Sequence, residues 1–312
     1  MTSGSAHQKA ERRLVEESAT LLDGPWEHHD VSANGVRLHV AELGTGPLVV
    51  LLHGFPQFWW AWRHQLVDLA GSGFRVVAPD LRGYAASDKP PRGYDALTQA
   101  ADIAGLIRAL GERDAVVVGH GWGGHVAWTL AAAHPALVRR LAVVSSPHPL
   151  RWSAALRGTG QHRAAGPLLR FQLPWLPERW LVADDARNVG ALLHSWGGPD
   201  FPDEQAERTY RTAMQILAAP HCALEPYRWA VRSLPRSDGR RFRRVVRRPI
   251  DAPTLQLHGS LDRCALPSTA SGSGRYVAAA YEWRLLDGVG HFAPEEAPAA
   301  VSGELVRWCK EA

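Results

Sequence analysis

Cysteine is scarce in this chain. Only three occur among 312 residues, Cys222, Cys264 and Cys309, and no pair has the Cys-X-X-Cys spacing. Widely separated cysteines argue against both a cysteine-based metal site and a disulfide framework. We therefore expect a reducing, cytoplasmic location. The sequence implies neither a metal nor an organic cofactor.

Long hydrophobic runs are also missing. A membrane-spanning helix needs about 18 or more consecutive apolar residues, and no run reaches that length. Residues 1–22 carry charges throughout and lack the apolar stretch of a signal peptide. We expect no spanning segment and no export signal, and we expect residues 1–24 to form a polar tail or a peripheral helix.

A strong charge of one sign is absent as well. The net charge of +4 gives no reason to expect nucleic acid as a partner. The exception is a local run of arginines between residues 236 and 248, namely Arg236, Arg240, Arg241, Arg243, Arg244, Arg247 and Arg248. Such a run can meet an anionic lipid or an acidic partner, or it can be a solvated connector. The sequence does not indicate an oligomeric state.

Short apolar runs are what the chain does contain. Apolar residues make up 46% of it, including 13 tryptophans, which is enough for a large core. The spacing predicts strands at residues 26–31, 36–43, 48–52, 74–78, 116–118, 141–144, 254–257 and 282–286. It predicts helices at residues 59–69, 97–110 and 295–308, and another directly after residue 121. Alternating strands and helices favour an α/β class with a mostly parallel sheet and helices on both faces.

This alternation stops between residues 150 and 235. That segment is rich in tryptophan, arginine and proline, has helical patterns, and contains no convincing strand. We predict that residues 150–235 form a helical cap over the strand ends of a core made of residues 25–149 and 236–312.

The most informative stretch is Val116-Val117-Val118-Gly119-His120-Gly121-Trp122-Gly123-Gly124. A β-branched run, a glycine-flanked turn and a helical pattern follow one another, which is the layout of a nucleophile elbow. Backbone N–H groups at the start of such a helix can stabilise an oxyanion. The position expected to carry the nucleophile is Gly121, which has no side chain.

Two later turns carry an acid and a base. Asp262 follows the strand predicted at 254–257, and His291 follows the strand at 282–286. The order nucleophile, acid, base is typical of α/β-hydrolases, in which the carboxylate orients the imidazole. His291 would then act as a general base. The alternatives are that Asp262 only stabilises its turn and that His291 caps a helix beginning near Pro294.

Five motifs in order resemble those of epoxide hydrolases in the α/β-hydrolase superfamily, with haloalkane dehalogenases as close relatives. They are His53-Gly54-Phe55-Pro56-Gln57-Phe58-Trp59-Trp60, Pro79-Asp80-Leu81-Arg82-Gly83-Tyr84, Gly119-His120-Gly121-Trp122-Gly123, His258-Gly259-Ser260-Leu261-Asp262 and Gly290-His291-Phe292. The resemblance implies an α/β-hydrolase fold with a helical cap. It also implies an oxyanion hole made by the N–H groups of Phe55 and Trp122.

The resemblance implies further roles. Asp80 and Arg82 are expected to be structural turn residues. Tyr227 resembles the second of two cap tyrosines that protonate an epoxide oxygen in the family. We also expect substrate-binding residues in the cap and the first motif, namely Tyr227, Trp59, His53 and Pro56.

The chain departs from the family pattern at two positions. The family's nucleophilic aspartate is replaced by Gly121. Pro167 stands near the position of the first cap tyrosine, for which Tyr210 is either a substitute or an ordinary helix aromatic. Ser145, Ser146 and Cys264 are weak candidates for a replacement nucleophile.

Two functions are compatible with this pattern. In the first, the chain is a hydrolase for a small apolar substrate, an epoxide or an ester-like molecule, and His291 with Asp262 activates water. In the second, it is a catalytically impaired or non-catalytic relative that binds a small ligand or a partner in the same pocket. A natural glycine at position 121 and one introduced to trap a complex look identical in the sequence.

Overall fold

The structure is a computed structural model that describes residues 15–156 and 160–311. Most of the predicted N-terminal tail, residues 1–14, lies outside the described residues. The part that is described contains a short helix, η1 (Glu17–Thr20). No helix in the described ranges is both long enough and apolar enough to cross a membrane.

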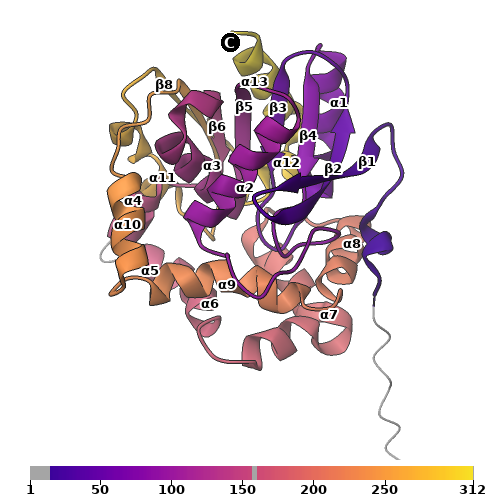
Figure 1. The fold of residues 1–312 in the computed structure, drawn as a ribbon. Coiled ribbons are helices and arrows are strands. Elements are labelled where there is room, and N and C mark those ends of the chain that lie inside the picture. The colour runs from indigo at the N-terminus through magenta and orange to yellow at the C-terminus, as the bar shows by residue number, and fades with distance from the viewer. Residues whose placement is uncertain (1–14, 157–159, 312) are drawn as a thin grey trace, which may run out of the picture.

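One mixed sheet forms the centre of the described chain (Figure 1), and its strand order is β1-β2-β4-β3-β5-β6-β7-β8. The strands are β1 (Glu27–Ala33), β2 (Val36–Leu43), β3 (Leu48–Leu52), β4 (Arg75–Pro79), β5 (Ala115–His120), β6 (Val138–Val144), β7 (Thr254–Gly259) and β8 (Tyr281–Leu286). Strand β2 pairs antiparallel with both β1 and β4, and the remaining pairs are parallel. All eight strand predictions are confirmed, with ends that differ by a few residues.

The strand sequences explain their positions in the sheet. Every residue of β3 and β5 is buried, as expected of apolar runs covered by helices on both faces. The first hairpin turns at Asn34 and Gly35, whose φ values of 50° and 78° are those of the turn that best matches the twist of two paired strands.

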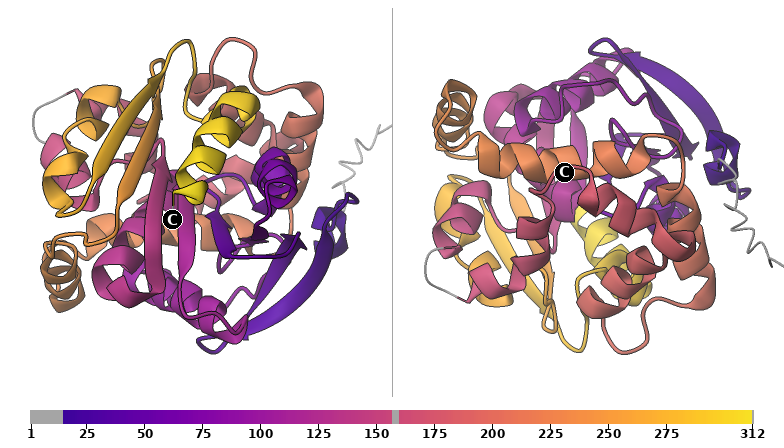
Figure 2. Two further views of the ribbon diagram at one scale, coloured as in Figure 1. Left: turned by 90° about the horizontal axis from the view of Figure 1, so that it is seen from above. Right: turned by 90° about the horizontal axis from the view of Figure 1, so that it is seen from below.

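Helices cover both faces of the sheet. Seen from above (Figure 2, left), α2 and α3 lie on one side, and α1 and α13 lie on the other. The helices that flank the strands are η2 (Trp59–Trp62), α1 (Arg63–Gly71), α2 (Ala96–Ala109), α3 (Gly121–Ala133), η3 (Pro135–Leu137), α11 (Pro267–Ala270), η4 (Ser273–Tyr276), α12 (Ala293–Glu296) and α13 (Pro298–Lys310). The helix predicted at 295–308 is thus broken before Pro298, because proline cannot donate the backbone hydrogen bond that would continue it.

The described part of the chain between β6 and β7 contains helices but no strand of the sheet, and we call residues 149–245 the helical insertion. Its helices are α4 (Pro149–Ala155), α5 (Gln161–Ala164), α6 (Gly166–Arg170), α7 (Leu176–Trp196), α8 (Glu204–Met214), α9 (Ala219–Arg232) and α10 (Ser237–Val245). Helices α5–α9 lie across one end of the sheet, at the front of the view from below (Figure 2, right). The division into a core and a separate cap domain stays a prediction.

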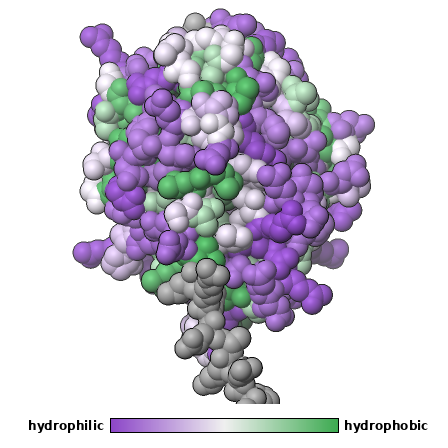
Figure 3. All heavy atoms as spheres, turned by 90° about the vertical axis from the view of Figure 1, so that its right-hand side faces the viewer, coloured by the Kyte–Doolittle hydropathy of each residue, from purple (hydrophilic) through white to green (hydrophobic). Residues whose placement is uncertain are grey.

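The arginine run begins at Arg236, the N-cap residue of α10, and continues along this helix and beyond it. Six of its seven side chains are exposed, and Arg243 is half-buried. Phe242 anchors this helix to α3 through a ring contact with His125, with centroids 5.6 Å apart. On another face of the molecule (Figure 3), hydrophilic side chains dominate and hydrophobic ones form small separate areas.

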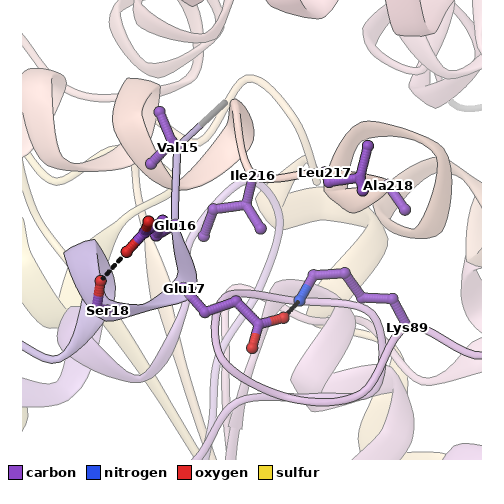
Figure 4. A pocket seen from close by; sticks show the side chains of 8 residues that line it. All are labelled: Val15, Glu16, Glu17, Ser18, Lys89, Ile216, Leu217 and Ala218. Atoms are coloured by element: carbon purple, nitrogen blue, oxygen red, sulfur yellow. Dashed lines mark hydrogen bonds and ion pairs between the residues drawn. The ribbon is translucent and has the colours of Figure 1, made fainter. Parts of the chain in front are cut away.

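A recess of about 630 Å³ opens between the N-terminal segment and the connection from α8 to α9 (Figure 4). Ile216 and Leu217 form its apolar side. Lys89 on the opposite side pairs with Glu17, at 2.6 Å between Nζ and Oε1. Its lining includes none of the predicted site residues.

The turn between β5 and α3 is packed tightly against the end of β3. A Cβ atom on Gly123 would lie 2.3 Å from the carbonyl oxygen of Leu52 and 2.5 Å from that of His53. A Cβ on Gly119 would lie 2.4 Å from the carbonyl oxygen of Gly123. Neither position therefore has room for a side chain, and both clashes are with rigid backbone.

This packing predicts that Gly123→Ala destabilises the fold. The added methyl group would push β3 and α3 apart, and overpacking of this kind costs about 1–3 kcal/mol or more. Gly303→Ala is the matched control, because Gly303 lies on the exposed side of α13 with open space around it. Alanine there should raise the free energy of unfolding by roughly 0.5–1 kcal/mol. Urea denaturation of both variants gives the comparison, and equal stabilities would contradict this account.

Candidate active site

Gly121 is the first residue of α3, directly at the carboxyl end of β5. Its φ of +53° lies in the left-handed region, which side-chain-bearing residues rarely adopt. A Cβ atom built there would lie 3.4 Å from His291 Nε2 and 3.5 Å from Gly54 Cα, which are ordinary contact distances. The turn therefore has room for a Cβ atom at position 121 beside an imidazole nitrogen, and we call this place the space above Gly121.

His291 lies in the turn after β8 and is held on three sides. Its Nδ1 is 2.9 Å from Asp262 Oδ2, and its backbone N–H donates to the carbonyl of Trp196 at 2.9 Å. Its own carbonyl accepts a hydrogen bond from His120 Nε2 at 2.8 Å. The residue is only 4% exposed, and its Nε2 has no partner within the described residues. The imidazole is thus fixed with Nε2 facing the space above Gly121.

Asp262, in the turn after β7, is the buried partner of this imidazole. Its Oδ1 accepts hydrogen bonds from the backbone N–H groups of Cys264 and Ala265, each at 2.8 Å. Its Oδ2 also lies 3.2 Å from His258 Nε2. Burial alone would raise the pKa of Asp262, but the positive charge of His291 and hydrogen bonds from both histidines lower it below the ordinary value. The carboxylate therefore stabilises its turn and orients His291 at the same time.

The alternative that His291 caps a helix is wrong. The N-cap residue of α12 is Phe292, and no side chain caps that helix. His120 is fully buried in the packing, and burial together with the nearby charge of His291 lowers the pKa of His120 to about 3. His120 is therefore neutral, and its one N–H is used on the His291 carbonyl.

Two backbone donors lie beside the same space. Trp122 is the second residue of α3, so its N–H has no partner within the helix, and no side chain at the N-cap satisfies it. The N–H of Phe55 likewise donates to no acceptor in the described part of the chain. Both N–H groups are available to a ligand.

Aromatic side chains lie around Phe55, Trp122 and His291. Tyr227 on α9 contacts Trp122 and Phe55, with ring centroids 5.4 and 5.6 Å apart. Phe171 also lies 5.6 Å from Phe55, and Trp196 lies 5.9 Å from the His291 ring. The Tyr227 hydroxyl makes no hydrogen bond within the described residues, and burial raises its pKa well above the ordinary value. These aromatic side chains suit an apolar ligand, and the Tyr227 hydroxyl can donate a hydrogen bond to it.

Comparison with known proteins places this geometry in a family. The model of the alpha/beta hydrolase fold matches residues 47–298. The chain belongs to the alpha/beta hydrolase family. The AB hydrolase superfamily protein YfhM of Bacillus subtilis is 33% identical over 287 residues, which span 90% of this chain and 96% of that protein.

Epoxide hydrolases are among the relatives of this alpha/beta hydrolase. Epoxide hydrolase 4 of Mus musculus is 31% identical over 294 residues, covering 90% of this chain and 78% of that protein. The crystal structure of Epoxide Hydrolase A from Mycobacterium thermoresistibile matches with a TM-score of 0.78 and 29% identity, over 91% of this chain and 98% of that one. The predicted fold is confirmed, and so is the resemblance to epoxide hydrolases.

Three of the predicted substrate-binding residues are buried in the core of the alpha/beta hydrolase fold. His53 is fully buried, and its two ring nitrogens bond to the Gly54 carbonyl and the Leu81 N–H. The indole of Trp59 packs against Trp26 and the first hairpin, and its N–H donates to the Thr20 carbonyl. Pro56 is also buried. These contacts give the predicted substrate-binding role of the three residues no support.

The turn residues behave structurally, as expected. Asp80 accepts from the Trp59 N–H at 3.0 Å and lies 2.7 Å from His39 Nδ1. Arg82 forms a two-point ion pair with Asp102, at 2.8 and 2.6 Å.

The two residues considered for the first cap tyrosine lie in helices of the insertion. Tyr210 is fully buried and donates to Glu295 at 2.6 Å, so its hydroxyl already has a hydrogen-bond partner. Pro167 lies in α6, and its side chain is outside the described residues.

Sequence analysis missed the two carboxylates of α12. Glu296 Oε2 accepts from the N–H groups of Gly198 and Gly290, at 2.9 and 2.6 Å, and its Oε1 accepts from Phe292 at 2.7 Å. The neighbouring Glu295 pairs with Arg63 and bonds Tyr210 of the helical insertion. Two acidic residues closely following the predicted base were the signal. They join the turn of His291 to the insertion.

No group of three or more histidine, cysteine or acidic side chains in the described ranges is arranged to hold a metal ion. The three cysteines are unpaired.

The lowered pKa of Asp262 makes a prediction about acid stability. Because folding depresses this pKa, the stabilisation by the carboxylate is complete above the ordinary value of 3.8 and is lost as the pH falls below it. Asp262→Asn should cost about 1–3 kcal/mol at neutral pH, since a buried donor loses its acceptor. The difference in unfolding free energy between the two proteins should shrink toward about pH 2.

Chemical denaturation across this pH range measures the difference. Asp287→Asn is the matched control, because Asp287 lies exposed in the turn that leads to His291. A difference between the wild type and Asp262→Asn that stays constant with pH would contradict the assignment.

Glu296 should matter for the rigidity of the His291 turn. Glu296→Ala leaves three N–H donors without their acceptor, and Glu296→Gln removes one of the two acceptor oxygens. We expect faster amide hydrogen exchange at Gly290 and Phe292, more in Ala than in Gln, and a loss of about 1–3 kcal/mol for each buried donor left unpaired. Glu304→Ala on α13 is the control, since Glu304 pairs only with arginines at the surface. Unchanged exchange in Glu296→Ala would refute this role.

Proposed function

We propose that this chain is an epoxide-hydrolase-like hydrolase in which His291, oriented by Asp262, activates a water molecule in the space above Gly121. The observation that carries the proposal is the 2.9 Å hydrogen bond that leaves His291 Nε2 unpartnered and directed at that space. With the Nδ1 proton shared with an ionised aspartate, Nε2 is the basic nitrogen.

The reaction balances with these groups alone. Nε2 takes a proton from water, the resulting hydroxide attacks an epoxide carbon, and the carbon–oxygen bond of the ring breaks. The ring oxygen receives the proton of the Tyr227 hydroxyl, and the proton held by His291 restores Tyr227 through solvent. The products are a diol and the unchanged protein. General base catalysis of this kind contributes about 10²–10⁴ in rate.

The surrounding groups can supply a proton and stabilise negative charge, as this reaction requires. The raised pKa of Tyr227 keeps its hydroxyl protonated, so that it can donate. The N–H groups of Phe55 and Trp122 would stabilise negative charge as it develops beside Gly121. The aromatic wall of Phe55, Trp122 and Tyr227 favours a small apolar substrate, an epoxide or an ester-like molecule. We assign residues 150–235 as the cap that closes over it.

A second candidate function is ligand binding without turnover. It is favoured by Gly121 itself, because in this proposal Gly121 stands at the family's nucleophile position and cannot form a covalent ester. The pocket would then hold a small ligand or a partner. For either function we place the protein in a reducing, cytoplasmic location, in keeping with its unpaired cysteines. The arginines of residues 236–248 remain a candidate contact for an anionic partner.

The deciding experiment is diol formation from a panel of aryl and alkyl epoxides. We expect the chain to turn over slowly and His291→Ala to reduce the rate by about 10² or more. Gly121→Asp should act faster, because it supplies a tethered carboxylate nucleophile. His64→Ala is the matched control, since His64 is exposed on α1.

The outcomes separate the candidates. If only Gly121→Asp forms a diol, water activation by His291 is refuted, and the chain is a binder or a trapped form. If neither protein acts on any epoxide, the proposed substrate class is wrong. Activity that is equal in the wild type and His291→Ala would remove His291 from the mechanism.

A further inference from the structure

We propose that the turn between α6 and α7 docks the protein on an anionic lipid surface. Large apolar side chains are exposed throughout this turn and the start of α7, and we call the set the Trp175 patch: Leu173, Trp175, Leu176 and Trp180. The turn lies at the lower end of the molecule, on the side of the helical insertion that faces away from the sheet (Figure 1). Clustered apolar side chains on a surface are typical of interaction sites.

The patch stands on a fixed support. Phe171 and Leu181, on either side of it in the sequence, are buried. Arg228 of α9 is also buried, and it donates to the carbonyls of Phe171 and Leu173 at 2.8 and 2.9 Å. The same guanidinium pairs with Glu178 at 2.9 Å. The turn therefore has a defined shape, and its apolar side chains are exposed because of that shape.

The backbone directs the patch toward solvent. Trp175 has a φ of +49°, in the left-handed region that residues with a side chain rarely adopt, and it is 59% exposed. Leu176 and Trp180 are four positions apart at the start of α7, so they lie on one face of the helix. Strained backbone is concentrated at functional sites. Here it keeps a tryptophan in contact with water.

The charges around the patch are positive. The exposed side chains of residues 160–183 that carry a full charge are Arg163, Arg170 and Arg179. The guanidinium of Arg179 lies 5.8 Å from the centre of the Trp175 ring. Glu178, the one carboxylate of this stretch, is already paired with Arg228. The next two acidic residues, at 184–185, lie beyond the break in α7.

The end of α9 extends this surface toward the arginine run. Arg232 donates to the Gln172 carbonyl at 2.8 Å, which places the end of α9 beside the turn. Val231 and Leu234 are exposed there. Arg243 of the arginine run donates to the Leu234 carbonyl at 3.2 Å. Guanidinium groups therefore border exposed apolar side chains at this end as well.

An anionic lipid surface fits this combination of side chains. Tryptophan prefers the level of the lipid head groups, leucine favours the apolar region beneath them, and arginine is attracted to anionic head groups. A second copy of the chain fits less well. A symmetric dimer would set each patch against the same patch, so that Arg179 and its neighbours would face like charges.

The patch is adjacent to the candidate active site. Phe171, at the base of the turn, contacts both Phe55 and Tyr227, with ring centroids 5.6 and 5.8 Å apart. Docking would therefore bring an apolar substrate dissolved in the bilayer close to the site. This consequence rests on the proposed function, whereas the docking itself does not.

Binding of the full chain is measured by co-flotation with vesicles made of equal parts of phosphatidylcholine and phosphatidylserine. We expect the protein to float with these vesicles at low ionic strength, and much less with pure phosphatidylcholine or at high salt. The double variant Trp175→Ser, Trp180→Ser should bind at least about tenfold more weakly. Arg170→Gln and Arg179→Gln should each weaken binding about fivefold.

Matched controls separate the patch from general surface effects. Leu173→Ser is compared with Leu285→Ser, because the two leucines are 50% and 51% exposed and Leu285 lies on β8, outside the patch. Arg113→Gln is the control for the arginines, since Arg113 is exposed in the turn before β5. Both controls should bind vesicles like the wild type. Urea denaturation checks that every variant is folded, as expected for changes at exposed side chains.

Each contrary outcome overturns the proposal. These are no flotation with the anionic vesicles, equal flotation with both kinds of vesicle, and unchanged binding by the double tryptophan variant. A dimer in analytical ultracentrifugation that the tryptophan variant dissociates would assign the patch to a second copy. Binding to polyglutamate as strong as binding to the anionic vesicles would assign it to an acidic protein. None of these measurements uses an epoxide, so docking and the proposed function can fail independently.

Discussion

The close approach of the β5–α3 turn to the end of β3 is the constraint on which the site depends. Gly123 lies so near the Leu52 and His53 carbonyls that only a glycine fits. This contact sets the start of α3 next to the turn that carries Phe55. The two backbone N–H groups proposed as an oxyanion hole therefore come together through packing of the main chain, and no side chain has to hold them.

A buried carboxylate organises the other side of the site. Asp262 would be costly to bury as an isolated charge, and hydrogen bonds from two backbone N–H groups and two imidazoles offset that cost. The same contacts tie the turn after β7 to the turn after β8. Because Glu296 bonds the backbone of both the His291 turn and Gly198, the position of His291 is coupled to the position of the helical insertion.

Sequence reasoning predicted the parts of this protein that follow from periodicity and chain order. Buried apolar runs gave the strands, and the Asn34-Gly35 turn gave the hairpin. The ends of parallel strands meet at one edge of a sheet, which brought Asp262 and His291 together. Sequence reasoning did not predict the direction of side chains in irregular turns. His53 and Trp59 stand beside Phe55 in the sequence, yet both turn into the core.

The role of Glu296 was hidden for a related reason. Its three acceptor contacts are with backbone N–H groups, and every residue type but proline carries such a donor, so no spacing of side chains records the interaction. Similarly, Tyr210 was a plausible substitute acid by residue type alone. Only its position against Glu295 reveals that its hydroxyl is already used.

Gly121 affects the backbone strain of the β5–α3 turn but does not affect the hydrogen bonds that hold His291. The left-handed backbone that a nucleophile elbow requires costs a side-chain-bearing residue about 1–3 kcal/mol, and glycine avoids this strain. The hydrogen bonds of His291 go to Asp262, to the Trp196 carbonyl and from His120, so none of them requires a side chain at position 121. The orientation of His291 is therefore independent of the residue at position 121. Under the proposed function, a water molecule above Gly121 would be the nucleophile, whereas a ligand that only binds there would leave His291 without a reaction to catalyse.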